Sequence, residues 1–139
     1  MVHDDPDRLL TEIWFRRLLY IQGHLRGRTP IEPLLRHAFH MLQIAPLKWS
    51  DLVSNPVNES IFETALENED WNSAVAHLLG DRLRVTRLTP TSGSIAVNVR
   101  DKFASGSAVG ETFARAALGA WLTRLISAVS REAPEIECP

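Results

Sequence analysis

The sequence is poor in cysteine and has no long apolar run. Its single cysteine is Cys138, so neither an intrachain disulfide nor a thiolate-rich metal site can form. No segment contains the roughly 18 consecutive apolar residues that a membrane-spanning helix requires. The first residues, MVHDDPDR, lack the basic start and apolar run of a secretory signal peptide. We therefore expect a cytoplasmic protein that does not span or bind a membrane.

The composition is that of a folded protein. Apolar residues make up 45% and charged residues 23% of the 139 residues, a balance typical of globular chains and unlike that of disordered ones. A chain of this length can bury a core of its own. We expect a single domain over 1–139, with a helical part at 5–80, a hairpin and C-terminal helix at 81–131, and a frayed tail at 132–139.

Apolar residues at helical spacing predict two helices in the first part of the chain. The first is expected from Asp5, as the capping residue, to about Gly27. The sequence TPIE at 29–32 is typical of a capping box, in which Thr29 caps the second helix and Glu32 reaches back to the chain before it.

Two further helices are predicted before residue 80. Asn55, followed by proline, is typical of a helix start, and Asp70 is expected to cap a short fourth helix that ends at Gly80. Trp49 falls in the connector between the second and third helices, outside any apolar stripe. We therefore expect its side chain to be exposed.

The stretch GDRLRVTRLTPTSGSIAVNVRD, residues 80–101, alternates apolar and polar residues. This period of two predicts an antiparallel β-hairpin over about 82–100 with one buried face. The small-residue segment DKFASGSAVGET at 101–112 is interpreted as a loop, and a final helix is expected from about Gly110 to Ser130. The predicted fold class is therefore α+β: a mostly helical domain with a hairpin and a C-terminal helix packed on it.

Charge is segregated along the sequence. Residues 51–80 contain acidic residues and no Lys or Arg, whereas the first helices and the hairpin are basic. Such blocks are typical of a surface that binds a partner of opposite charge, but they also occur where exposed charges do no more than solvate the surface. The candidate partner-binding residues on the basic face are Arg82, Arg84, Arg100, Arg16 and Arg17.

The final helix is rich in alanine, which allows another backbone to come close. That backbone is either the hairpin of the same chain or a second copy of the protein. For the second case the candidate self-association residues are Ala117, Ala120 and Trp121. We expect a homo-oligomer.

No pattern of residues predicts catalysis. His37 and His40 are three apart on a predicted helix and could share a metal ion, but no third ligand is evident, so we predict no metal site. The serines of SGSAVG do not match the G-x-S-x-G nucleophile motif, and the glycines form no phosphate-binding loop. We expect a protein that is not an enzyme and has no cofactor.

Two functions remain open. The one we expect is a non-catalytic protein–protein interaction or assembly module that self-associates. The other follows from the element order, because helices followed by a hairpin and a C-terminal helix resemble winged-helix nucleic-acid-binding regulators. That resemblance implies that the helix before the hairpin enters the major groove. Here this segment, DWNSAVAHLLG, carries Asn72 and Ser73 but no Lys or Arg, so the basic hairpin would supply phosphate contacts, which do not by themselves specify a sequence.

Overall fold

The computed structural model describes residues 6–53, 58–88 and 93–132. The elements follow in the order α1 (Pro6–Leu25), α2 (Ile31–Gln43), the 3₁₀ turn η1 (Leu47–Trp49), α3 (Ser50–Val53), α4 (Glu59–Glu67), α5 (Trp71–Leu79), β1 (Arg84–Leu88), β2 (Ile95–Arg100), β3 (Ser105–Gly110) and α6 (Phe113–Glu132). The predicted α+β fold, mostly helical with a C-terminal helix on an antiparallel sheet, is confirmed.

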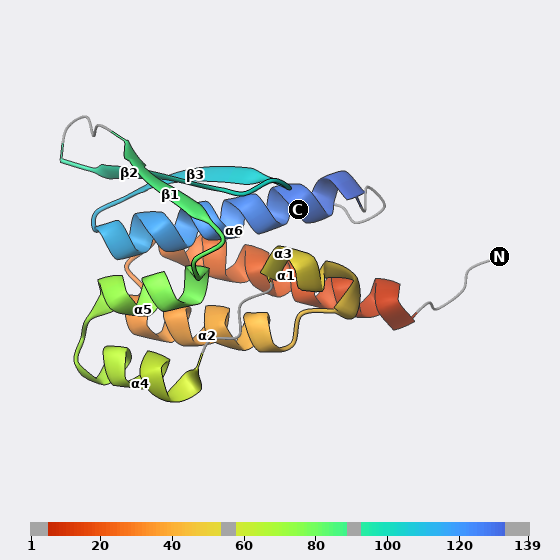
Figure 1. Cartoon of the computed structure of the whole chain (residues 1–139), viewed down its shortest axis with the longest axis horizontal. Helices are drawn as coiled ribbons and strands as arrows, with labels where there is room; N and C mark the ends of the chain where they lie inside the picture. Colours follow the sequence, from red (N-terminus) through yellow and green to blue (C-terminus); the bar gives the residue numbers. More distant parts are fainter. Residues whose placement is uncertain (1–5, 54–57, 89–92, 133–139) are drawn as a thin grey trace.

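Helix α6 is the central element of the fold. It contacts β2 and β3 on one side, and α1 and α5 on other sides. Figure 1 shows the sheet along one flank of α6 and the helices α1, α2 and α5 across it. Because α6 is covered from several directions, nearly every residue from Ala114 to Val129 is buried, and such a helix must be apolar almost all round.

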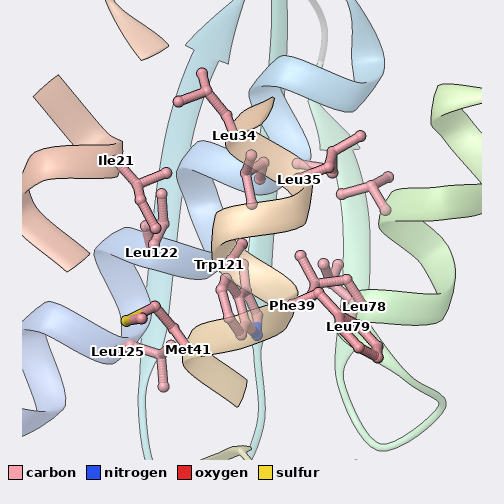
Figure 2. Close-up of a cluster of buried hydrophobic side chains, with 14 of the residues drawn as sticks. Ile21, Leu34, Leu35, Phe39, Met41, Leu78, Leu79, Trp121, Leu122 and Leu125 are labelled. Carbon is pink, nitrogen blue, oxygen red and sulfur yellow. The ribbon is translucent and has the colours of Figure 1, made fainter. Parts of the chain in front are cut away.

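The core is formed where α6 meets α2 and α5. Figure 2 shows large side chains of these three helices and of α1 gathered in one cluster with the Trp121 ring. Those labelled are Ile21, Leu34, Leu35, Phe39, Met41, Leu78, Leu79, Leu122 and Leu125. Trp121, Ala117 and Ala120 are all within this core, so the prediction that these three residues form a self-association surface is incompatible with their burial inside one chain.

The cap of α5 is as predicted, whereas the cap of α2 is not. The Asp70 side chain accepts a hydrogen bond from the backbone N–H of Ser73 at 3.2 Å, and Gly80 follows α5 with a φ of 75°. At α2, Pro30 occupies the cap position and makes no side-chain capping bond. The hydroxyl oxygen of Thr29 instead lies 3.1 Å from Nδ1 of His24, because the chain between α1 and α2 folds back on the end of α1.

The start of α4 lies three residues after the predicted one. Asn58 caps this helix, with its side-chain oxygen accepting from the backbone N–H groups of Ser60 and Ile61 at 2.9 and 3.3 Å. The predicted capping residues Asp5 and Asn55 lie outside the described residues, as do Cys138 and all of the predicted tail after Glu132.

Trp49 is buried, and the prediction that it is exposed is wrong. Its side chain is 1% exposed, and its Nε1 donates a hydrogen bond to Oγ1 of Thr11 in α1 at 3.0 Å. The connector therefore folds back onto α1. Sequence periodicity misses this contact because a single side chain in a short turn has no period.

The predicted hairpin is present, and it belongs to a three-stranded antiparallel sheet of order β1-β2-β3. Arg84 pairs with Arg100 at one end of the hairpin and Leu88 with Ala96 at the other. The third strand, β3, corrects the interpretation of Ser105–Gly110 as a loop.

Strand β3 is built of small residues because it lies directly on α6. A Cβ atom at Gly106 would lie 2.4 Å from the backbone oxygen of Ala120, and one at Gly110 would lie 2.8 Å from the backbone nitrogen of Ala116. Both distances are far inside van der Waals contact. The alanines of α6 therefore allow a close approach by the sheet of the same chain, which is the first of the two alternatives that the sequence leaves open.

Candidate functional site

The sheet has one face on α6 and one face turned away from it. Val97 and Val99 of β2 are buried against α6, and successive strand residues point to opposite faces. The other set of residues, with their paired neighbours on β1 and β3, forms what we call the outer face. Its members are Arg84, Thr86, Leu88, Ala96, Asn98, Arg100, Ser105, Ser107 and Val109. Figure 1 shows no helix over this side of the sheet within the described chain.

Two arginines lie side by side on the outer face. Arg84 of β1 and Arg100 of β2 are direct cross-strand partners, and both are exposed. Like charges placed directly opposite each other destabilise a strand pair, by an amount on the order of 0.2–1 kcal/mol. Within the described residues neither arginine forms an ion pair that offsets this repulsion. The sheet therefore carries a local concentration of positive charge.

Strand β1 is the most exposed element of the sheet. It lies at an edge of the strand order, and all five of its residues are exposed, including Val85 at 39% and Leu88 at 41%. Arg87 extends over the ring of Phe113 at 5.9 Å. An edge strand with apolar side chains and free backbone groups is the usual place for a partner strand to add.

The remaining basic residues predicted for the partner-binding face do not join this surface. Arg82 precedes β1 and lines a cavity. Arg16 and Arg17 lie on α1, which Figure 1 places across α6 from the strands. Arg16 is 3.3 Å from a carboxylate oxygen of Glu12. The structure thus brings together Arg84 and Arg100, and separates them from the arginines of α1.

The two histidines of α2 differ in how deeply they are buried. His37 is half-buried and His40 is exposed. Burial, followed by the nearby charges of Arg17 and His40, lowers the pKa of His37. The Tyr20 ring packs against both His24 and His37, with ring centroids 4.3 and 5.7 Å apart. Among the residues described, no three His, Cys, Asp or Glu side chains are grouped so that they could hold a metal ion.

A cavity that sequence reasoning misses lies between α3, α5, the turn from β2 to β3, and α6. Its volume is about 500 Å³. Apolar and charged side chains both contribute to its wall. The residues that line it are Asp51, Leu52, Val53, Leu78, Leu79, Arg82, Leu83, Asp101, Lys102, Phe103, Trp121 and Arg124.

The guanidinium of Arg124 is the most buried charged group described. The residue is 1% exposed, and its Nη2 donates hydrogen bonds to the Leu52 carbonyl at 2.9 Å and to the Asp101 carboxylate. Its Nε and Nη1 are also buried and have no acceptor among the described residues. The sequence contains a sign of this burial. Arg124 lies seven residues after Ala117 and three after Trp121, so it is a charged residue on the apolar stripe of the final helix.

Asp101 is held in place from two directions. Burial by itself would raise the pKa of this carboxyl, but the hydrogen bonds from Arg124 and from the backbone N–H groups of Phe103 and Ala104 outweigh it, and the pKa is lowered. Those backbone bonds are 2.8 and 3.0 Å long. The ion pair therefore ties the β2–β3 turn to α6 in its charged form.

No protein family, curated protein or solved structure in our comparisons matches this chain. The fold and the surfaces described above define the class: an α+β protein in which a central helix supports a sheet with a basic outer face. None of the helices described has the length and apolar character needed to cross a membrane.

Proposed function

We propose that this protein is a non-catalytic interaction or assembly module of the cytoplasm, and that it binds an acidic protein surface through β1 and the outer face of the sheet. The observation that supports this proposal most is the exposed Arg84–Arg100 pair, which has no counter-ion among the described residues. A repulsive pair costs stability in the free protein, and that cost is recovered when an acidic group binds between the two arginines.

The edge strand supplies the other contacts. Val85 and Leu88 are partly exposed apolar side chains on β1, and they can contact a partner segment that extends the sheet. Backbone hydrogen bonds along the strand would give affinity, while the arginines would favour acidic sequences and speed the encounter.

A second copy of the protein has a surface of suitable charge. The segment from α4 to the start of α5 is acidic, with Glu59, Glu67, Glu69 and Asp70 all exposed. We propose that self-association joins this segment to the outer face of a neighbouring copy, in place of the buried residues of α6. Because the two surfaces differ, the contact is head-to-tail and either closes into a ring or continues as a chain.

Nucleic acid is the competing partner for the same arginines. A winged-helix regulator also needs a recognition helix, and α5 carries Asn72 and His77 on exposed positions without any Lys or Arg. Phosphate contacts from the sheet would then bind without specifying a sequence. This difference is why we place an acidic protein surface first.

The test is the mass in solution, measured by light scattering over a range of protein concentrations at low and moderate salt. We expect the wild type to exceed the monomer mass of 15.6 kDa at high concentration and low salt. The double variant Arg84→Glu with Arg100→Glu should remain a monomer under the same conditions. A matched control is Arg16→Glu with Arg17→Glu, which changes the charge equally at two exposed sites of α1, away from the outer face, and should associate as the wild type does.

The same measurement separates the competing partners. Duplex DNA and short RNA are added to the wild type and to both variants. A large complex with nucleic acid whose stability falls steeply with salt would replace our proposal by the nucleic-acid alternative. A wild type that stays monomeric at every concentration would exclude self-association, and equal behaviour of the two double variants would exclude the outer face.

A further inference from the structure

We propose that the cavity beside Arg124 binds a small organic anion with an apolar body, such as an aryl carboxylate. This proposal is independent of the partner-binding surface described above. The cavity volume of about 500 Å³ lies within the range of roughly 300–1,000 Å³ that is usual for small-molecule sites.

The apolar part of the wall suits an aromatic or aliphatic body. Leucine side chains come from α3, from α5 and from the segment before β1, and two aromatic rings come from the β2–β3 turn and from α6. They are Leu52, Leu78, Leu79, Leu83, Phe103 and Trp121. Small-molecule sites are commonly apolar in this way, with few polar groups that fix the orientation of the ligand.

The charged part of the wall favours an anion. Arg82, Lys102 and Arg124 are cationic, and Asp51 and Asp101 are anionic. Arg124 and Asp101 pair with each other, so their charges compensate. Of the other charged residues on the wall, Arg82 and Lys102 are cationic and Asp51 is anionic, and this net positive charge would favour an anionic group over a neutral or cationic one.

Arg124 provides the specific hydrogen-bond donors. Its guanidinium is held in one orientation by Leu52 and Asp101, yet two of its nitrogens, Nε and Nη1, have no acceptor in the described part of the chain. Buried donors in proteins are nearly always paired. Both nitrogens are covered by protein atoms at the wall of the cavity, so a bound carboxylate would reach them only after a small shift of those atoms, and it would then supply the acceptor that they lack.

The experiment is an NMR titration of the full ¹⁵N-labelled chain with 2-naphthoate, and with 2-naphthamide as an uncharged probe of the same shape. We expect saturable shifts that include the indole N–H of Trp121 and the backbone amide of Phe103. The amide probe should bind at least about tenfold more weakly, because it lacks the charge that the cavity selects.

Two sets of variants locate the binding. Lys102→Glu reverses an exposed charge at the cavity and should weaken 2-naphthoate by about tenfold or more, whereas Lys48→Glu, outside the cavity wall, should not. Arg124→Met combined with Asp101→Asn removes the buried pair without leaving one charge behind. This double variant should keep only part of the preference for 2-naphthoate, because Lys102 remains on the wall.

Other results would overturn the proposal. They are an equal affinity of the wild type for both probes, shifts confined to residues outside the cavity wall, or no saturable shift at millimolar naphthoate. An unchanged preference for naphthoate in Lys102→Glu would also overturn it. This test stays informative if the double variant does not fold, because Lys102 lies at the surface.

Discussion

At the scale of single residues, the Arg124–Asp101 ion pair holds together several parts of the fold. It joins the β2–β3 turn to α6 and, through the Leu52 carbonyl, to α3. Removing one partner of a buried ion pair leaves the other charge buried without compensation, and this typically costs about 3–5 kcal/mol. The pair therefore fixes the relative positions of three elements around the cavity.

We expect Asp101→Asn to lower the free energy of unfolding near neutral pH by about 3 kcal/mol. The pKa of Asp101 in the folded protein is lowered below its ordinary value of 3.8. Its contribution is therefore fully present above the unfolded-state pKa and is lost as the pH falls through the folded-state pKa. Urea denaturation at several pH values measures this effect.

In Asp101→Asn, stability should fall less between about pH 5 and pH 3 than it does in the wild type. A useful control is Asp70→Asn, where the carboxylate caps α5 at the surface and no buried cation loses its partner. Parallel pH profiles for the wild type and Asp101→Asn would contradict the role given to this ion pair.

At the scale of elements, β3 approaches α6 so closely that its glycines leave no room for a side chain. We expect Gly106→Ala to lower the free energy of unfolding by about 3 kcal/mol or more, because the new Cβ would lie 2.4 Å from backbone atoms of Ala120 and Arg124, and backbone atoms cannot move aside as a flexible side chain does. Denaturant unfolding measures the change.

Gly23→Ala is the matched control for this substitution. Gly23 lies inside α1, and apart from its chain neighbours and the adjacent backbone of α1 itself nothing described lies within 4 Å of the position that its Cβ would take. Alanine there should raise stability by roughly 0.5–1 kcal/mol through helix propensity. If both alanine variants changed stability in the same direction, close packing of β3 on α6 would not be the cause.

The same contact explains which parts of the fold were predictable from the sequence. The hairpin was predictable because its residues alternate, and α5 because Asp70 and Gly80 mark its two ends. Strand β3 was not, since Gly106, Ala108 and Gly110 are small for the sake of packing and carry no alternation of apolar and polar side chains. The candidate surface was predictable in part, because Arg84 and Arg100 occupy polar positions of the alternating hairpin, whereas the cavity depends on contacts between distant segments.

At the scale of the whole molecule, local stability should decrease from α6 to β1. Helix α6 is covered by the sheet and by other helices, whereas β1 is exposed along its length. We expect amide hydrogens of α6 to exchange with a free energy close to that of global unfolding, and those of β1 with a much lower one. Hydrogen exchange followed by NMR or mass spectrometry tests this order.

Binding of a partner should slow hydrogen exchange at the surface that it covers. The amides of β1 would become protected and those of α4 unaffected if the partner is a foreign protein, whereas self-association would protect both. Exchange rates in β1 equal to those in α6 in the free protein would contradict the view of β1 as an open edge.

The central position of α6 also has a consequence for biosynthesis. Helix α1 packs on α6, yet the two are separated by about 90 residues of chain that must be translated in between. At roughly 5–20 residues per second, the apolar face of α1 waits on the order of 5–20 s at the ribosome before its partner emerges. During that interval the apolar surface of α1 that α6 later covers is exposed to the cell, and we expect a chaperone that binds apolar segments to be its first partner.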